Sequence, residues 1–173
     1  TPEDLIEPLS RVNQAVWEKS QADPALRGMG TTLTMAKVVG DTVLVGHIGD
    51  SRAYVINPQG QLRQVTEDHS LVEELVRTGS LSKGEALTHP QRNYLTRALG
   101  TQPRVKITVI GFRLNPGDIC LLCTDGLTRE LEPRDIGRTV IEAPDLQSAA
   151  NTLVDLANAR GGRDNVTVVL FAR

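Results

Sequence analysis

The sequence has few of the residues that serve nucleic-acid or membrane binding. Aromatic residues make up only 3% of its 173 residues, and its formal net charge is −2. A chain so close to neutral lacks the basic footprint that attracts nucleic acid or an anionic membrane, and it has few rings on which bases could stack. No apolar run approaches the length needed to span a bilayer. We therefore expect neither a nucleic-acid partner nor a membrane partner.

Cysteine is also scarce. The only two, Cys120 and Cys123, lie three positions apart in an apolar run. This spacing could be half of a zinc site or a redox pair, but no second Cys or His pair follows at ligand spacing. We favour two small core residues in a strand. Free thiols suit a reducing compartment, so we predict a cytoplasmic protein.

The chain starts at Thr1 and has no methionine before Met29. We expect it to be a piece of a longer protein. With 39% hydrophobic and 23% charged residues it is ordinary for a globular chain, and its length suffices for one domain with a core.

A helix is predicted at the start of the chain. Residues 1–4 combine a capping hydroxyl, a proline and two acids, which is typical of a helix start. Pro8 predicts either a kink or a later start of the regular helix. One apolar stripe is expected to be buried: Leu5, Leu9, Val12 and Val16.

Strand patterns rich in β-branched residues occupy most of the rest of the chain. They are Thr31–Val39, Thr42–Ile48, Arg52–Ile56, Gln61–Val65, Lys106–Phe112, Asp118–Cys123 and Val166–Phe171. Short turns join the first four, which predicts an antiparallel meander. Further helices are expected after Pro133 and from Asp145 to Gly161. Sheets covered by helices place the fold in the α+β class.

Residues 66–104 differ from their surroundings. They are polar and interrupted by glycine and proline, with one short helical pattern around Leu71 and Leu75. A long excursion from a compact sheet is usually a functional loop, so we predict a flap here.

Three aspartates share one setting. Asp50 lies at a break between two strands, Asp125 directly follows an apolar strand, and Asp164 directly precedes one. Each lies in a glycine-containing segment, where backbone can approach a ligand closely. Short carboxylates at strand ends suit hard ions such as Mg²⁺ and Mn²⁺, which prefer oxygen ligands. Aspartate near glycine is also ordinary turn chemistry, and for any one of the three alone that reading is the stronger.

Six segments, taken together and in order, resemble the motifs of type 2C metal-dependent serine/threonine protein phosphatases of the bacterial kind. They are residues 29–33, 49–54, 66–70, 95–100, 116–127 and 164–167. The resemblance implies a single phosphatase domain over residues 1–173, with two packed antiparallel sheets flanked by helices. It also implies two or three Mn²⁺ or Mg²⁺ ions, with Asp125 and Asp164 binding one ion and Asp50 helping to hold another.

The family also places an Asp-Gly pair and a phosphate-binding arginine before the first helix. Neither is present here, so we expect the fold to lack its first strands and a metal-bridging carboxylate. We expect little metal binding or activity from such a fragment.

Two histidines and an asparagine are further polar residues near the predicted site segments. His47 lies in a strand and is predicted to be a packed polar residue, whereas His89, in the flap, could contact substrate or donate a proton. Asn165 could orient Asp164 or a metal-bound water, and it could equally form a turn.

The resemblance implies that a metal-activated water hydrolyses phosphoserine or phosphothreonine in proteins. Its partners would be phosphorylated proteins, including a cognate kinase. The alternative is a catalytically inactive phosphatase-like module that binds or regulates a partner; the retained aspartates favour the enzyme, because clustered carboxylates are costly without a ligand.

Overall fold

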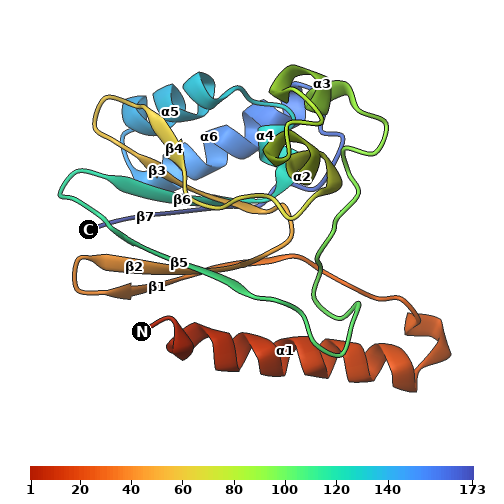
Figure 1. Cartoon of the computed structure of the whole chain (residues 1–173). Coiled ribbons are helices and arrows are strands. Elements are labelled where there is room, and N and C mark those ends of the chain that lie inside the picture. Colours follow the sequence, from red (N-terminus) through yellow and green to blue (C-terminus); the bar gives the residue numbers. More distant parts are fainter. The chain divides into compact units, whose positions relative to one another are not determined.

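The computed structural model describes all residues 1–173, which form two compact units (Figure 1). One unit comprises residues 1–35, 46–50 and 67–110, and the other comprises residues 36–45, 51–66 and 111–173. The helices are α1 (Glu3–Ala22), η1 (Pro24–Leu26), α2 (Leu71–Arg77), α3 (Lys83–Thr88), α4 (Asp125–Thr128), α5 (Pro133–Glu142) and α6 (Leu146–Ala159). The strands are β1 (Leu33–Val39), β2 (Thr42–Ile48), β3 (Arg52–Ile56), β4 (Leu62–Gln64), β5 (Thr108–Arg113), β6 (Ile119–Cys123) and β7 (Val168–Ala172).

The second unit contains a complete four-stranded antiparallel sheet in the order β4-β3-β6-β7. Its two central strands are its most buried, because they are paired on both sides and covered on both faces. Tyr54 lies opposite Leu121, and Leu121 lies opposite Leu170. The register brings the end of β6 beside the start of β7, with Cys123 opposite Val168.

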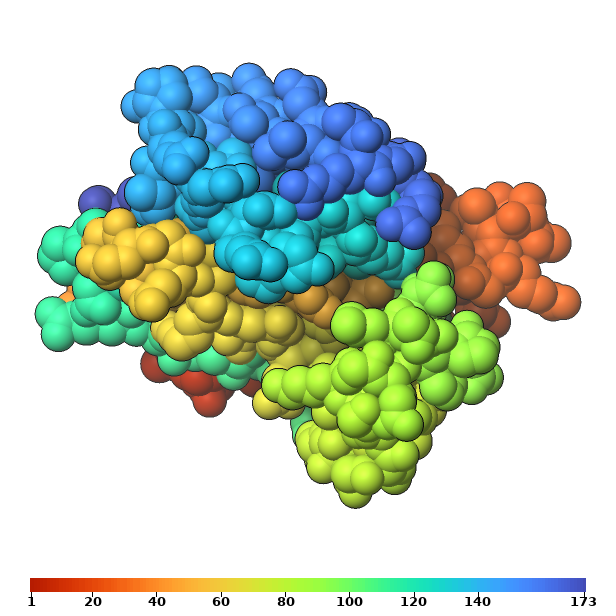
Figure 2. All heavy atoms as spheres, turned by 90° about the horizontal axis from the view of Figure 1, so that it is seen from above, coloured from red at the N-terminus to blue at the C-terminus, as the bar shows by residue number.

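Helices cover one face of this sheet, as Figures 1 and 2 show for α5 and α6, which lie side by side. Buried apolar side chains from sheet and helices form one core there: Tyr54, Ile56, Leu121, Cys123, Leu127, Leu131, Ile136, Val140, Ala149, Leu153 and Ala157. The opposite face packs within the same unit against residues of β2 and the segment after β5. That second core contains Val43, Val45, Ala53, Val55, Leu114 and Cys120.

The two cysteines belong to different cores. Cys120 is buried in the core beside β2, and Cys123 in the core beneath the helices. They are three positions apart on a strand, where side chains alternate between faces. Neither forms a disulfide. The prediction of two core residues is therefore confirmed, and burial raises the pKa of the Cys120 thiol to about 12.

In the first unit, α1 packs against β2 at Gly46, where a side-chain Cβ would lie 2.6 Å from a methyl group of Leu9. The buried positions of α1 include Leu5, Leu9 and Asn13, at steps of four. The predicted place of Val12 in the stripe is wrong, since it is 43% exposed. Its neighbour Asn13 is buried instead, because it hydrogen-bonds to another segment.

Pro8 lies inside α1, which already begins at Glu3. Of the two alternatives for Pro8, a kink or a later helix start, the later start is therefore excluded. No helix of the chain is both long enough and apolar enough to cross a membrane.

The predicted meander is wrong at one junction. β1 and β2 belong to a three-stranded sheet in the order β1-β2-β5, whereas β3 and β4 belong to the four-stranded sheet. The chain changes sheet at residues 49–51, where Gly49 has a φ of 109°. A Cβ at Gly49 would lie 2.6 Å from the Cβ of Thr32, so this turn requires glycine.

The predicted flap region lies between β4 and β5 and contains the helices α2 and α3. The short helix around Leu71 is confirmed as α2. The second helix, α3, was not predicted, although Ser82 and Glu85 form a capping box at its start. Figure 2 shows this part of the first unit as a cluster of yellow-green spheres.

Asn13 fastens α1 to the segment that ends this region. Its side-chain nitrogen donates to the carbonyls of Gln102 (3.1 Å) and Pro103 (3.3 Å). Its side-chain oxygen accepts from the backbone N–H of Gly100 at 2.9 Å. An apolar side chain at position 13 would leave these backbone groups without a partner, which explains a polar residue in the buried stripe.

Candidate active site

Asp125 and Asp164 lie at the junction of β6 and β7 in the second unit. Asp125 is the first residue of α4, two positions after the end of β6, and Asp164 lies in the loop that leads to β7. Since these strands are antiparallel neighbours, the end of one and the start of the other share an edge of the sheet. The fold thus brings together two side chains that are 39 positions apart in sequence.

The guanidinium of Arg129 contacts both carboxylates. One terminal nitrogen (Nη2) forms a close ion pair with Asp125 Oδ2, and the other (Nη1) lies 3.5 Å from Asp164 Oδ2. Arg129 is the C-cap residue of the short helix α4, four residues after Asp125, so the two side chains lie on one face. One internal cation therefore bridges the two predicted metal ligands.

Backbone packing holds the two aspartate segments together. A Cβ at Gly126 would lie 2.3 Å from the carbonyl oxygen of Asn165, so only glycine lets α4 approach this closely. The hydroxyl of Thr124 donates to that same carbonyl (3.2 Å) and accepts from the N–H of Thr167 (2.9 Å). The close approach of the Asn165 carbonyl thus explains why position 126 is glycine.

Asn165 contributes to this junction through its backbone. Its N–H donates to Asp164 Oδ1 at 2.8 Å, and this bond orients the Asp164 carboxylate. This is a local side-chain-to-backbone contact of the kind that favours aspartate in turns. An action of the Asn165 side chain on a metal-bound water stays a prediction.

A second ion pair lies beside the first. Arg163 donates to both oxygens of Glu130, from Nε at 2.8 Å and from Nη2 at 3.1 Å. These hydrogen bonds lower the pKa of the Glu130 carboxyl and raise that of the Arg163 guanidinium. The consecutive residues 129 and 130 thus pair with the consecutive residues 164 and 163.

Asp164 and Asn165 line a hollow of about 490 Å³. Its other walls come from the C-terminal half of α6 and from the loop before β7: Val154, Asn158, Gly162, Arg163 and Val166. The Asp164 side chain is 48% exposed and the Asp125 side chain is 25% exposed, so solvent can reach both carboxylates. A ligand from solution can therefore reach them.

The donor set fits a hard divalent ion that keeps much of its water. The two carboxylates are oxygen donors, they lie close enough to share one cation, and Mg²⁺ is usually held by one or two carboxylates with several waters. The chain has no group of three or more His, Cys, Asp or Glu side chains arranged to hold a metal ion. Asp125 and Asp164 would therefore be the two protein ligands of such an ion.

Asp50 belongs to the first unit, at the turn where the chain changes sheet. His69 fixes this turn, because its Nδ1 accepts from the N–H of Gly49 (3.1 Å) and its backbone N–H donates to the carbonyl of Gly49 (2.8 Å). The half-buried Asp50 follows directly. Its predicted role as a metal ligand stays a prediction.

His47 and His69 are both buried, and their ring centroids are 4.6 Å apart. His47 contacts the Thr34 hydroxyl (2.9 Å) and the Glu67 carbonyl (3.0 Å), which confirms it as a packed polar residue. The Nε2 atom of His69 contacts the Thr108 hydroxyl at 3.0 Å. Burial lowers the pKa of both rings, and that of His69 falls to about 3.

His89 follows α3 directly and is half-buried. Its Nδ1 accepts from the N–H of Gln91 at 3.1 Å, so one ring nitrogen serves the local turn. Contact of His89 with a substrate stays a prediction.

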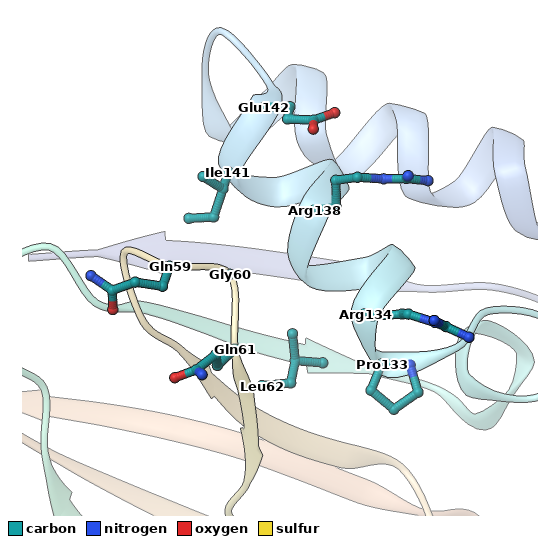
Figure 3. Close-up of a pocket in the computed structure, with 9 residues that line it drawn as sticks. All are labelled: Gln59, Gly60, Gln61, Leu62, Pro133, Arg134, Arg138, Ile141 and Glu142. Atoms are coloured by element: carbon teal, nitrogen blue, oxygen red, sulfur yellow. The ribbon is translucent and has the colours of Figure 1, made fainter.

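Another hollow, of about 470 Å³, lies between the β3–β4 turn and α5 (Figure 3). The side chains of Arg134 and Arg138 extend away from the turn, and Gln59 extends away from the helix. Its polar groups therefore do not converge on one point, as those of a specific polar site would.

Sequence reasoning missed Arg129 and the pair of Glu130 with Arg163. The signal for Arg129 was its position four residues after Asp125 at a strand-to-helix turn. No sequence signal pairs Arg163 with Glu130, because that contact depends on how the loop before β7 folds.

Comparison with known proteins gives one consistent result. Residues 3–163 match the family described as Protein phosphatase 2C. The serine/threonine phosphatase stp of Listeria monocytogenes is 38% identical over 169 residues, which cover 98% of this chain and 67% of that protein.

Solved structures agree with the sequence comparison. The crystal structure of the serine/threonine phosphatase Stp1 from Staphylococcus aureus is 38% identical and has a TM-score of 0.94, covering 99% of this chain and 67% of that one. A catalytic domain of the serine/threonine protein phosphatase PstP, solved in complex with two manganese ions, is 36% identical and has a TM-score of 0.81. The match covers 91% of this chain and 65% of the PstP chain.

Proposed function

Because this chain belongs to the protein phosphatase 2C family, we propose that its site hydrolyses phosphoserine and phosphothreonine in proteins with a divalent cation. The observation that carries the proposal is the junction of β6 and β7. There Asp125 and Asp164 share one cationic partner, beside a hollow that Asp164 lines. A phosphate ester needs positive charge at such a place, because negative charge on the phosphoryl oxygens must be neutralised as the bond breaks.

The residues of this chain have distinct tasks in the proposal. Asp125 and Asp164 hold the ion, and the N–H of Asn165 orients the Asp164 carboxylate. A bound divalent ion supplies charge that lowers the pKa of a coordinated water and stabilises phosphoryl oxygens. Asp50 would serve a further ion, and His89 would contact the substrate. The side chain of Asn165 would orient bound water.

The cofactor and the setting are part of the same proposal. We favour Mn²⁺ or Mg²⁺, supported by the oxygen donors here and by the two manganese ions of the PstP structure. The substrates are phosphorylated proteins in a signalling pathway, among them a cognate kinase. The two cysteines form no disulfide, which favours a reducing, cytoplasmic setting.

The test is phosphate release from a phosphothreonine peptide, with Mn²⁺ or Mg²⁺ and with a chelator. It uses the 173-residue chain and a longer protein that contains it. Asp125→Asn and Asp164→Asn should each reduce metal-dependent turnover by on the order of 100-fold or more, because each removes a direct ligand. Asp50→Asn should reduce turnover while leaving the ion at Asp125 and Asp164 in place.

The matched control is Asp155→Asn, which removes the same charge from an exposed position of α6. It should leave turnover unchanged. If both proteins are inert with every divalent ion, the phosphatase proposal fails and the binding-module alternative takes its place. Equal activity with and without chelator would also contradict it.

A further inference from the structure

The position of Arg129 suggests a role beyond packing. Its guanidinium spans two carboxylates that come from different segments, and it is itself only 34% exposed. A guanidinium and a divalent ion are both cations that bind carboxylate oxygens. Both therefore draw on the same oxygens, Oδ2 of Asp125 and Oδ2 of Asp164.

We propose that Arg129 is a built-in counter-ion that bridges Asp125 and Asp164 until a divalent cation replaces its guanidinium. This inference rests on the proposed function only in taking these carboxylates as the metal ligands. Arg129 would then set the metal concentration at which the site fills. It is a positioning residue, since its action on the reaction passes through the two aspartates.

The two contacts of Arg129 differ in a way that suits exchange. Arg129 pairs with Asp125 from the same turn of the chain, whereas Asp164 comes from another segment and its Oδ2 lies 3.5 Å from the guanidinium. The guanidinium can therefore leave Asp164 while it remains tethered through its own backbone, whose N–H donates to the Asp125 carbonyl at 2.9 Å. Exposed ion pairs of this kind are weak and are readily broken.

Other contacts keep Asp164 near Asp125 when Arg129 moves, although the bridge adds to the stability of the loop. The two hydrogen bonds from Arg163 to Glu130 anchor the residue before it, and the packing of Gly126 on Asn165 anchors the residue after it. Removal of the Arg129 charge should therefore leave the ligands near each other and without a competing cation.

The first test is a Mn²⁺ titration, without substrate, of the 173-residue chain and of a longer protein that contains it, followed by the electron paramagnetic resonance signal of the free aqueous ion. Arg129→Gln should bind Mn²⁺ about tenfold more tightly, because one positive charge close to a divalent ion is removed. Arg129→Lys keeps the charge and should stay close to the unchanged protein. Arg138→Gln, which removes an arginine paired with Asp135 on α5, is the matched control and should have no effect.

The second test uses the metal-free protein. Hydrogen exchange of the N–H groups of residues 165–167 should be faster in Arg129→Gln than in the unchanged chain, and Mn²⁺ should restore protection. Weaker or unchanged Mn²⁺ binding in Arg129→Gln would overturn the proposed competition. So would Mn²⁺ binding that Asp125→Asn leaves unchanged. Unchanged exchange would overturn the bridge. These readouts need no turnover, so a failed phosphatase assay and a failed titration are separate results.

Discussion

The two units hold their candidate aspartates in opposite ways. The turn at Asp50 is fixed by a buried histidine pair whose contacts are neutral and largely with backbone and hydroxyl groups. The junction at Asp125 and Asp164 is fixed by the solvent-facing ion pair of Arg129 with Asp164, by the ion pair of the exposed Arg163 with the buried Glu130 side chain, and by one tight backbone contact.

The difference concerns what can be exchanged. Buried neutral hydrogen bonds have no competitor in solution and are costly to leave unmade, so they form a permanent frame. Exposed ion pairs can be replaced by ions from solution and are weakened by salt. We expect substitutions in the frame and at the backbone contact to cost stability, and changes to the ion pairs to alter ligand binding.

The largest effect is expected at Gly126. In Gly126→Ala the new Cβ would lie 2.3 Å from the Asn165 carbonyl oxygen, so the two aspartate segments must separate. The free energy of unfolding should fall by about 3 kcal/mol, measured by urea denaturation. Gly84→Ala is the control, because its Cβ meets only the Ser82 hydroxyl at 4.0 Å and it lies in a helix. That change should be neutral or stabilising, and an equal loss in both variants would contradict the contact.

Asn13 provides a comparable test of the neutral frame. Asn13→Ala removes the partners of the Gly100 N–H and of two carbonyl groups. Stability should fall by about 2–3 kcal/mol, because buried polar groups lose their hydrogen bonds. Gln14→Ala removes an exposed amide paired with Glu18 on the same helix and should change little. Similar losses of stability in the two variants would show that the buried hydrogen bonds contribute no more than an exposed one.

The pH dependence of stability separates the histidine pair from the ion pairs. The pKa of His69 is about 3 in the folded protein, below its usual 6.5, so the unfolded chain binds more protons at acid pH. Its contribution is fully present above pH 6.5 and is lost as the pH falls toward 3. Between about pH 7.5 and pH 5 the loss should be about 2 kcal/mol.

His69→Gln supplies the comparison for that measurement. Glutamine can accept from Gly49 and donate to Thr108, but it does not titrate in this range. The variant should lose less stability than the unchanged chain between the same two pH values. If the two unfolding profiles run parallel with pH, His69 is not the group that titrates.

The smallest expected effect is that of salt. An increase from about 0.05 M to about 1 M NaCl should raise hydrogen exchange at residues 163–167 by about two- to threefold, because the ion pairs there are screened. Exchange of the Gly49 N–H, which donates to a buried neutral ring, should stay the same. A response of both regions would remove the distinction between them.

Much of the fold could be predicted from sequence, because period-two patterns and turn residues act locally. The predicted strand Thr42–Ile48 matches β2, and the predicted strand Arg52–Ile56 matches β3. Their membership in different sheets could not be predicted, since a break of three residues is compatible with either pairing. The choice of Asn13 over Val12 as a buried residue likewise depended on a partner some 90 positions away.

The candidate site shows the same limit. Its aspartates were recognisable from motifs with glycine beside strand ends, and the structure brings Asp125 and Asp164 together. Their shared cation was not foreseen, because the contact of Arg129 with Asp164 joins segments 35 positions apart. Metal binding by Asp50, Asp125 and Asp164 stays a prediction until the titrations are made.

Because the two cysteines lie on opposite faces of β6, each thiol can report the opening of one core of the second unit. Cys120 lies in one core and Cys123 in the other, so each thiol becomes accessible only when its own core opens. A thiol reagent followed by mass spectrometry of the two positions would time the two openings separately in the unmodified protein. Labelling at one rate would mean that both faces of the sheet open in a single cooperative step, and two rates would mean that helices and strands detach independently.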